Sequence, residues 1–539
     1  MFQKVSHING LVEEQEILFS TRFDYFFPEA ARSSPCLLPT SESTLEALRK
    51  LADEMADPGE SPPAGDPITE FDSDNPAILT YFGQFIDHDI TARTDRDGNV
   101  TSIGKGELIL PLEPDQVIRL LRNGRRPTLD LDSVFGDGPG LVSGQEAIEG
   151  SMSVTQSQIL YEQDNLKLSI FEDKSGGTAR FDLIRSTDVD KAIDEDGKLV
   201  EKIMYPATIA DGRNDENVII SQLQTAFIKF YNAIYNASTE DGPKRKYIRA
   251  RQLATWAYQF VVVNDYLCKV CDPAVVEDTL VNGPRFIGAS AGRGSAFMPL
   301  EFSTAAFRFG HSMIRPFYKL NNLSGNVNIM NLLGTNGNPD NFGGLEMGDP
   351  KQLVAERVID WNNFVGSDPQ KARKIDSKIS KGLFDLSLGD RRSDPVLKHL
   401  ARSNLFRGYN LSIPTGQAMC DAFGIRPMTA KQIRSGQGEE TATLLENSYL
   451  DQRTPLFYYI LREAAFQQGG QRLGELGSRI VSETIINLLK QDPNSYLNNV
   501  HVQSVVSDPS GEITGITVAS GPNGTIQSLE DILAFAGVL

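Results

Sequence analysis

Residues 75–90 read Asn-Pro-Ala-Ile-Leu-Thr-Tyr-Phe-Gly-Gln-Phe-Ile-Asp-His-Asp-Ile, and this stretch carries the main fold signal of the chain. Asn75 can cap a helix and Pro76 suits the first helical turn, where a backbone N–H is not needed. Apolar residues then recur at helical spacing, at positions 78, 79, 82, 85, 86 and 90. The stretch therefore predicts a largely apolar helix.

Three ionisable residues, Asp87, His88 and Asp89, follow one another in this apolar helix. Gln84 lies four residues before His88, so the two share a helix face, and the two aspartates flank it. Burying three such groups is costly unless each has a partner. The pattern favours a polar pocket, and the alternative is a solvated helix edge.

A second histidine lies in the apolar and aromatic segment 307–314, which is expected to be helical until Pro316 ends it. His311 follows Gly310, which costs a helix about 1 kcal/mol and would let a flat cofactor approach closely. Arg308 would lie on the same side and could pair with a carboxylate. The alternative is a histidine that is simply satisfied in the core.

Two loops add further polar candidates. In the loop 211–217, Asn214 or Asp215 can cap the helix expected from residue 218, but capping does not explain Arg213 and Glu216 at the same helix mouth. In the loop 125–133, two carboxylates, at positions 130 and 132, stand beside a hydroxyl and exposed carbonyls. Hard cations such as calcium prefer oxygen ligands of this kind, although such pairs are often only solvated or capping.

The rest of the chain is expected to be mainly helical, with long loops and a few short strands around one large domain. Residues 1–70 are expected to form an N-terminal extension that wraps the core, 71–500 the main domain, and 501–539 a short tail with a hairpin that turns at Ser510-Gly511. Helical patterns are expected at about 42–53, 216–236, 246–271, 299–315, 350–362, 394–403, 441–450 and 470–490.

Bulk composition excludes several classes of protein. The formal net charge of −19 argues against nucleic-acid binding, which needs a basic surface. No apolar run is long enough to predict a membrane span, and Met1–Gly10 is too polar to predict a signal peptide. We therefore expect a cytoplasmic location by default, or secretion by a non-classical route.

Taken in order, these segments resemble the animal-type haem peroxidase superfamily, especially its bacterial members. The family pattern is Gln-x-x-Asp-His-Asp, a calcium loop, Arg-x-x-Glu, Phe-Arg-Tyr/Phe-Gly-His and Asn-x-x-Arg. The corresponding residues are Gln84/Asp87/His88/Asp89, the loop at Asp130–Asp132, Arg213/Glu216, Phe307–His311 and Asn404/Arg407. The resemblance runs from about residue 81 to 497 and implies one large, mainly α haem-peroxidase domain.

The resemblance also implies roles in catalysis. His311 would bind the haem iron, and Asn404 would accept a hydrogen bond from its other ring nitrogen. His88 would move a proton between the two oxygens of hydrogen peroxide, acting as general base and then acid. Arg213 would stabilise the charge that develops as the O–O bond breaks, and Gln84 would order water or a halide.

Further residues are implied as contacts to haem b and calcium. Asp87 and Glu216 resemble the carboxylates that form ester bonds to haem methyls, and Arg308 and Arg407 resemble the partners of the haem propionates. The calcium ligands would be Asp89, the Thr128 carbonyl, Asp130 and Asp132.

The chain departs from the usual family residues at three positions, and a fourth position separates it from two groups of related enzymes. Asn217 stands where a methionine would form a sulfonium link to haem, so that link is not expected. Arg126 replaces a usual threonine ligand of calcium, and Gln224 replaces a frequent histidine. Arg308 stands where cyclooxygenases and fatty-acid α-dioxygenases have their radical tyrosine.

The expected activity is therefore that of a haem-dependent peroxidase, which uses hydrogen peroxide to oxidise halides, phenols or other small donors. One alternative is a fatty-acid dioxygenase on the same fold, which the missing tyrosine disfavours. The other is a catalytically silent haem or adhesion protein, which the presence of both His88 and Arg213 disfavours.

Overall fold

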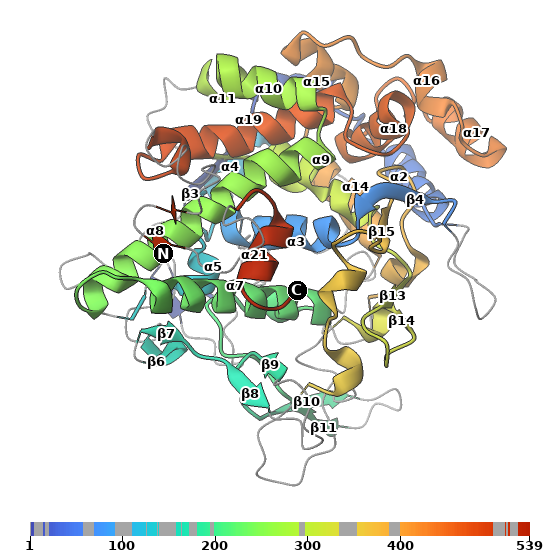
Figure 1. Ribbon diagram of the computed structural model, residues 1–539. Coiled ribbons are helices and arrows are strands. Elements are labelled where there is room, and N and C mark those ends of the chain that lie inside the picture. The colour runs from blue at the N-terminus through green and yellow to red at the C-terminus, as the bar shows by residue number, and fades with distance from the viewer. Residues whose placement is uncertain are drawn as a thin grey trace.

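A computed structural model describes residues 2–4, 14–16, 21–57, 69–91, 110–125, 127–136, 138–139, 158–162, 164–171, 180–193, 199–289, 297–333, 353–386, 399–499, 512–513, 516–517 and 526–539. Within these residues helices dominate, and the strands form only small sheets of two or three (Figure 1). This is the mainly helical fold that the sequence predicts.

The helices are α1 (Pro28–Ala31), α2 (Glu42–Glu54), α3 (Ile78–Ile90), α4 (Pro114–Leu120), α5 (Asp132–Phe135), α7 (Val218–Ala237), α8 (Pro243–Val261), α9 (Cys268–Val270), α10 (Pro273–Asn282), α11 (Phe286–Ala289), α12 (Leu300–Thr304), α14 (Leu400–Asn410), α15 (Gly416–Phe423), α16 (Ala430–Arg434), α17 (Glu439–Asn447), α18 (Leu456–Gln468), α19 (Glu475–Gln491) and α21 (Leu529–Phe535). The strands are β1 (Phe2–Lys4), β2 (Glu14–Glu16), β3 (Thr21–Asp24), β4 (Asp72–Pro76), β5 (Arg122–Asn123), β6 (Tyr161–Glu162), β7 (Asn165–Leu166), β8 (Ser169–Phe171), β9 (Arg180–Asp182), β10 (Asp188–Ile193), β11 (Leu199–Met204), β12 (Phe297–Pro299), β13 (Phe317–Lys319), β14 (Asn326–Asn328), β15 (Lys371–Arg373), β16 (Glu512–Ile513) and β17 (Ile516–Thr517).

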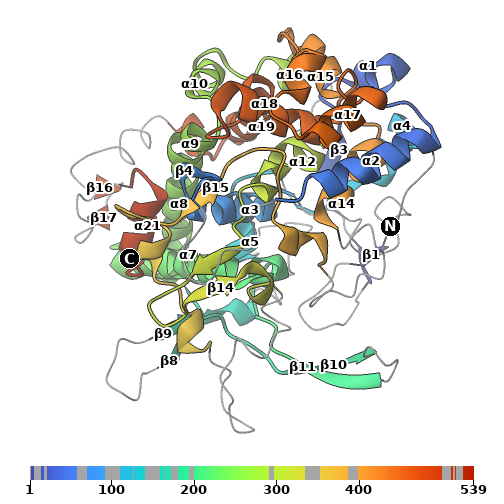
Figure 2. The same ribbon diagram turned by 90° about the vertical axis from the view of Figure 1, so that its right-hand side faces the viewer.

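Helix α3 lies in the interior of the molecule in both ribbon views (Figures 1 and 2). Every residue of α3 except Gln84 is buried, and the helix packs against α5, α7 and a 3-10 helix at Ala306–His311. Phe85 stacks on Phe227 of α7 with 4.6 Å between ring centroids, and Tyr258 of α8 meets both rings edge-on. A helix surrounded in this way is expected to be mainly apolar, which explains its sequence before Asp87.

The start of α3 differs from the prediction. Asn75 and Pro76 belong to strand β4, which pairs with β15, and the N-cap residue is Ala77, without a side-chain cap. The Asn75 side chain instead donates a hydrogen bond of 2.7 Å to the Gln471 carbonyl. The predicted cap is therefore wrong, because tertiary contacts already use these residues.

The helix predicted over 299–315 is divided at Ala305, whose backbone is not helical (φ −128°, ψ −62°). Helix α12 ends before it, and residues Ala306–His311 form the tighter 3-10 helix. In a 3-10 helix, residues three apart eclipse one another. Arg308 and His311 therefore lie on the same side, as the sequence suggests, although by a different helical geometry.

Most of the other predicted helices are present. Patterns at 42–53, 216–236, 441–450 and 470–490 correspond to α2, α7, α17 and α19, and the pattern at 246–271 corresponds to α8 and α9 with a π-helical turn at Val262–Leu267 between them. The pattern at 394–403 lies partly outside the described residues, and α14 covers its end.

The helix predicted over 350–362 is not formed in the described part of that range, and helix α18 was not predicted. Residues 353–362 form only 3-10 turns, because the Asp360 N–H donates to the Leu320 carbonyl instead of continuing a helix. Helix α18 is absent from the predictions, because its first nine residues are all buried and show no amphipathic pattern.

The two ends of the chain contact the helical body. Strand β3 pairs in parallel with β12, and both carboxylate oxygens of the buried Glu301 accept a hydrogen bond from the Phe26 N–H. At the other end, α21 packs against α7. Strands β16 and β17 pair antiparallel, with Ile513 opposite Ile516, and the turn predicted at Ser510-Gly511 lies outside the described residues.

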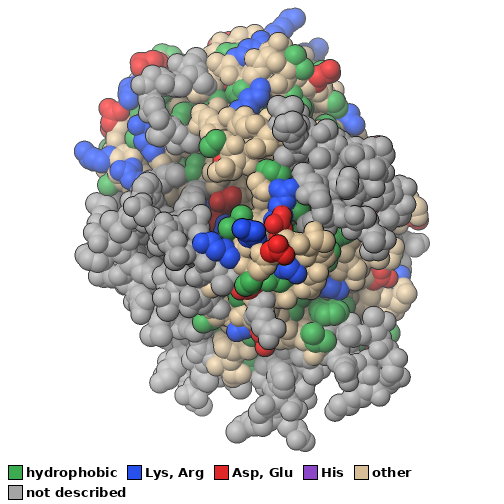
Figure 3. Space-filling model, turned by 60° about the vertical axis from the view of Figure 1, so that its left-hand side comes forward, with side chains coloured by type: hydrophobic (Ala, Val, Ile, Leu, Met, Phe, Trp, Pro, Cys, Tyr) green, Lys and Arg blue, Asp and Glu red, His purple; other side chains and the backbone are tan. Residues whose placement is uncertain are grey.

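None of the described helices is long and apolar enough to cross a membrane. On the face shown in Figure 3, Lys and Arg side chains gather with Asp and Glu side chains beside a hollow near the middle of the view. The charges described on this face are therefore of both signs.

Candidate active site

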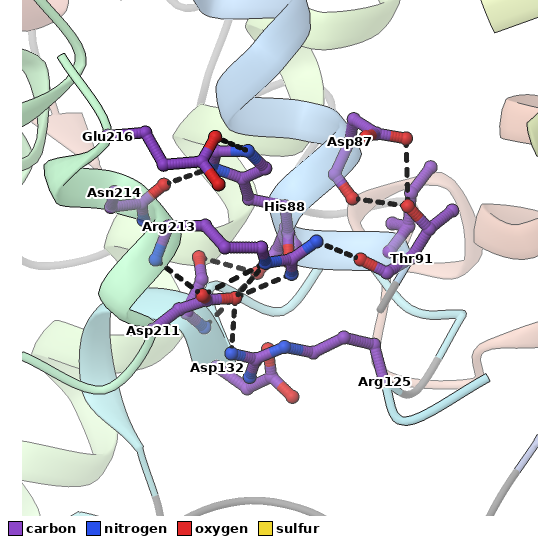
Figure 4. Close-up of polar contacts among 12 residues, drawn as sticks. Asp87, His88, Thr91, Arg125, Asp132, Asp211, Arg213, Asn214 and Glu216 are labelled. Atoms are coloured by element: carbon purple, nitrogen blue, oxygen red, sulfur yellow. Dashed lines mark hydrogen bonds and ion pairs between the residues drawn. The ribbon is translucent and has the colours of Figure 1, made fainter. Parts of the chain in front are cut away.

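His88 is buried near the end of α3, between two polar side chains from the segment before α7. Its Nδ1 lies 2.7 Å from the Asn214 Oδ1, and its Nε2 lies 3.9 Å from a carboxylate oxygen of Glu216 (Figure 4). Burial and the nearby Arg213 hold the pKa of His88 below its ordinary value, outweighing the neighbouring carboxylates. A neutral imidazole can accept a proton, which is the property a general base needs.

Arg213 lies beside the end of α3, in a 3-10 helix at Gly212–Asp215. Its guanidinium donates to the carboxylate of Asp211 (2.6 Å) and to the backbone carbonyls of His88 (2.7 Å) and Thr91 (2.6 Å) (Figure 4). Burial would raise the pKa of Asp211, but Arg125 and Arg213 hold it well below its ordinary value. The guanidinium therefore fixes the last turn of α3 through charge-assisted hydrogen bonds.

Asp87 connects α3 to the segment that carries His311. Its carboxylate lies 3.3 Å from the Arg308 guanidinium and accepts a 2.8 Å hydrogen bond from the Thr91 hydroxyl. Burial would raise the pKa of Asp87, but Arg308, His88 and Arg213 together lower it. The carboxylate is therefore ionised at neutral pH and holds the two histidine-bearing segments side by side.

Gln84, Glu216 and Asn217 form a second polar group on the same face of α3 as His88. The Gln84 amide donates to a Glu216 carboxylate oxygen (3.4 Å) and accepts from the Asn217 amide (3.2 Å). Gln84 and Glu216 are only partly buried. This edge of the site, next to His88, is therefore in part accessible to solvent.

His311 ends the 3-10 helix and is half-buried. Its Nδ1 lies 2.9 Å from the Asn404 Nδ2 on α14, and the same Nδ2 donates to the Leu400 carbonyl (3.0 Å). The structure thus brings together the predicted pair but turns the Asn404 amide the opposite way, with Nδ2 rather than Oδ1 toward the ring. Arg407 lies three residues further along α14 and is half-buried.

The three aspartates that were predicted to bind calcium come together at the last turn of α3. Asp89, Asp130 and Asp132 each present a carboxylate oxygen, and these oxygens lie within 4.8 Å of one another. Burial, and then Asp132 and Asp130, raise the pKa of Asp89 well above its ordinary value. Thr128 has a buried hydroxyl that has no hydrogen-bond partner among the described residues, and Arg126 lies outside them. This oxygen-rich set has the chemistry of a calcium site.

Arg125 joins this carboxylate cluster to the site around Arg213. It is buried, and its guanidinium donates to Asp132 (3.1 Å) and to Asp211, which in turn binds Arg213 (Figure 4). Asp132, Arg125, Asp211 and Arg213 thus form a continuous chain of opposite charges.

Three residues of the site are absent from the sequence predictions as functional groups: Asp211, Asn214 and Gln224. Neither Asn214 nor Asp215 caps α7, because Asn217 accepts from the Ile220 N–H and Asp211 caps the preceding 3-10 helix. Asn214 is left free to face His88. The spacing Asp-x-Arg could have indicated Asp211, whereas the contact between Asn214 and His88 joins residues 126 positions apart and has no local signal.

A family model for animal haem peroxidases matches residues 157–507, well over half of the chain. The chain therefore belongs to the animal haem peroxidase family. The matched range contains Arg213, Glu216, His311 and Asn404, whereas His88 precedes it.

Two curated relatives match parts of the chain. A peroxidase-like protein of Margaritifera margaritifera is 26% identical over 272 residues, which are 46% of this chain and 33% of that protein. Peroxidase mlt-7 of Caenorhabditis elegans is 32% identical over 133 residues, which are 23% of this chain and 17% of that protein. The chain thus matches a third or less of the length of these relatives.

Solved structures extend the likeness over nearly the whole chain. Peroxidase A from Dictyostelium discoideum has a TM-score of 0.57 and 14% identity, covering 97% of this chain and 99% of that one. The fatty acid alpha-dioxygenase of Arabidopsis thaliana has a TM-score of 0.52 and 14% identity, covering 95% and 76%. At such identities these likenesses establish the fold alone.

Proposed function

We propose that this protein is a haem peroxidase that reduces hydrogen peroxide and oxidises a small donor such as a halide or a phenol. Its family membership supports haem binding and an oxidoreductase activity. The observation that carries the proposal is the juxtaposition of two histidine-bearing segments, joined by the ion pair between Asp87 and Arg308. His88 is neutral and suited to move protons, and the His311 Nδ1 lies within hydrogen-bonding distance of the Asn404 amide, the kind of contact that orients a metal-binding histidine.

Two features around His311 fit a flat, iron-bearing group. A Cβ added at Gly310 would meet no atom within 4 Å, so there is open space next to the histidine. The Asn404 Oδ1 is buried and has no hydrogen-bond partner among the described residues. Iron binding through Nε2 needs a proton on Nδ1, and this oxygen can accept it once the amide turns over.

Haem, when bound, would supply the iron that binds peroxide and the electrons that reduce it. His88 would then take a proton from one peroxide oxygen and return it to the other. Gln84 and Glu216, at the open edge, would orient water or the donor. Because the Arg213 guanidinium is committed to Asp211 and two carbonyls, we assign it the role of fixing α3 and adding positive charge nearby.

Four residues would contact the rest of the haem. Asp87 and Glu216 would form ester bonds to haem methyl groups, each of which would lose a C–H proton and two electrons, with hydrogen peroxide as the oxidant. Arg308 and Arg407 would pair with the haem propionates. The ionised Asp87 supports the first assignment, because a carboxylate must be deprotonated to act as a nucleophile. Haem that extracts fully into acidified acetone after turnover with peroxide would overturn the ester bonds.

The first test of this function compares two oxidants. With haem and hydrogen peroxide, the protein should oxidise a small phenol at a rate that follows the peroxide concentration. With an unsaturated fatty acid and no peroxide, an oxygen electrode should record little uptake. Oxygen uptake that follows the fatty acid would instead favour a dioxygenase, and no oxidation in either assay would favour a silent haem protein.

The dioxygenase remains the second candidate because solved fatty acid alpha-dioxygenases share the fold. That reaction would need a tyrosine near the iron, but Arg308 occupies the expected position and is paired with Asp87. Tyr318 is the nearest tyrosine after His311 in the sequence, and it is fully buried with its hydroxyl accepting from the Arg315 N–H. The charge and pairing of Arg308 favour the peroxidase.

Calcium would bind at Asp89, Asp130, Asp132 and Thr128. Removing it with a chelator should lower the melting temperature, because three close carboxylates then repel one another. A cation held at a hundred times its Kd stabilises a protein by about 2.7 kcal/mol. Asp130→Asn should abolish the effect of the chelator, and Asp421→Asn, which changes an exposed carboxylate, should keep it. An unchanged melting temperature with no bound metal by elemental analysis would disprove the site.

A further inference from the structure

We propose that Asn214 is a positioning residue that holds the His88 ring in one tautomer, with the proton on Nδ1, and that Gln224 in turn orients Asn214. The tautomer follows from contacts within the protein. Its catalytic meaning rests on the proposed peroxidase function.

The contact between Asn214 and His88 is short and fully enclosed. The Asn214 Oδ1 lies 2.7 Å from the His88 Nδ1, and the Asn214 side chain has no exposed surface. Its backbone N–H donates to the Asp211 carbonyl (3.0 Å), so the 3-10 helix holds it in place. Because water cannot replace either partner, the bond determines which atom of the ring can carry a proton.

A second contact sets the direction of this bond. The Asn214 Nδ2 donates to the Gln224 Oε1 at 2.9 Å, and Gln224 lies fully buried in the second turn of α7. An amide has its donor and its acceptor on opposite branches, so Oδ1 faces the ring as long as Gln224 presents its oxygen to Nδ2. An acceptor there requires a donor at Nδ1, and the neutral ring then has a lone pair on Nε2.

The lone pair is directed to the side of the ring where Glu216 lies (Figure 4), and Gln84 donates a hydrogen bond to that carboxylate. A general base must accept the substrate proton with this nitrogen, whereas the other tautomer would present an N–H instead. Asn214 provides the acceptor without adding another negative charge to a region that already holds Asp87, Asp211 and Glu216.

The hydrogen bonds among His88, Asn214 and Gln224 also have one competing arrangement. The Gln224 Nε2 is buried and has no hydrogen-bond partner among the described residues. If both amides turned over, Gln224 would donate to Asn214, Asn214 would donate to Nδ1, and the proton of His88 would move to Nε2. The two arrangements predict opposite tautomers, so a direct measurement distinguishes them.

The experiment is nitrogen NMR on the full-length chain labelled with 15N-histidine and purified without added haem. The chain has five histidines, and a His88→Gln variant identifies the signals of His88. We expect the His88 Nδ1 to carry the proton in the unmodified protein. In Asn214→Ala the proton should shift to Nε2, whereas Asn214→Asp, which keeps an acceptor oxygen, should preserve it on Nδ1. Gln222→Leu removes a different buried amide from α7 and should leave the tautomer unchanged.

With haem added, Asn214→Ala should slow the reaction with peroxide about 10- to 100-fold, the loss that is typical when the hydrogen-bond partner of a metal-bound histidine is removed and that we expect for His88 by analogy. Asn214→Asp should recover most of that loss. A proton on Nε2 in the unmodified protein would overturn the proposal even if Asn214→Ala fails to fold. Failure of the proposed function would appear differently, as absent peroxidase activity in a protein whose His88 still has the Nδ1 proton.

Discussion

Replacement of His88 by alanine should slow the reaction with hydrogen peroxide by about 10²- to 10⁴-fold, the range that positioned acid–base groups contribute. His88 is a buried, neutral base at the partly exposed edge of the site. The other nitrogen groups nearby are the charged Arg213 guanidinium and the hydrogen-bonded amides of Gln84 and Asn214, which do not act as bases. The measurement is the rate of spectral change when haem-loaded protein is mixed with peroxide under single-turnover conditions.

A matched control for this variant is His399→Asn. His399 is also largely buried, but its Nδ1 caps α14 by accepting from the Arg402 N–H, and asparagine is a good N-cap residue. The control should retain the rate. Equal rates in His88→Ala and the unmodified protein, with equal haem content, would mean that proton transfer depends on another group.

Replacement of His311 by alanine should remove most of the bound haem. His311 is the half-buried histidine next to the open space at Gly310, and Asn404 engages its Nδ1. After unbound haem is removed, the Soret absorbance per mole of the variant should be close to that of protein without haem. Asn404→Ala should weaken haem binding by about 10- to 100-fold, because it removes only the partner of the ligand.

The same control, His399→Asn, should retain haem in this measurement. Its role in α14 is informative, because α14 also carries Asn404 and must stay folded for the site to form. If His311→Ala and His399→Asn bind equal amounts of haem, the iron ligand must be sought elsewhere in the chain.

The sequence was sufficient to predict helices and site residues that are marked by a pattern of neighbouring residues. The spacing of apolar residues was enough for α3, α7 and α19, and the resemblance to the family brought together His88, Arg213, His311 and Asn404. Helix α18 escaped prediction because a helix buried on nearly all sides has no amphipathic pattern.

Other errors have a different physical origin. Asn75 has the composition of a helix cap, but pairing between β4 and β15 outweighs that local preference. Either Asn214 or Asp215 was expected to cap α7, and only the fold reveals that Asn217 does so and that Asn214 faces His88. Contacts between residues far apart in sequence cannot be derived from the preferences of each residue alone.

The chain of charges from Asp132 to Arg213 restricts how these four positions can change over evolutionary time. It contains two acids and two bases, so its members neutralise one another. Breaking a buried ion pair by removing one partner typically costs about 3–5 kcal/mol. Loss of Arg125 would leave two carboxylates without their shared cation. Viable substitutions at these positions should therefore arise in compensating pairs, so the positions are expected to covary among close relatives.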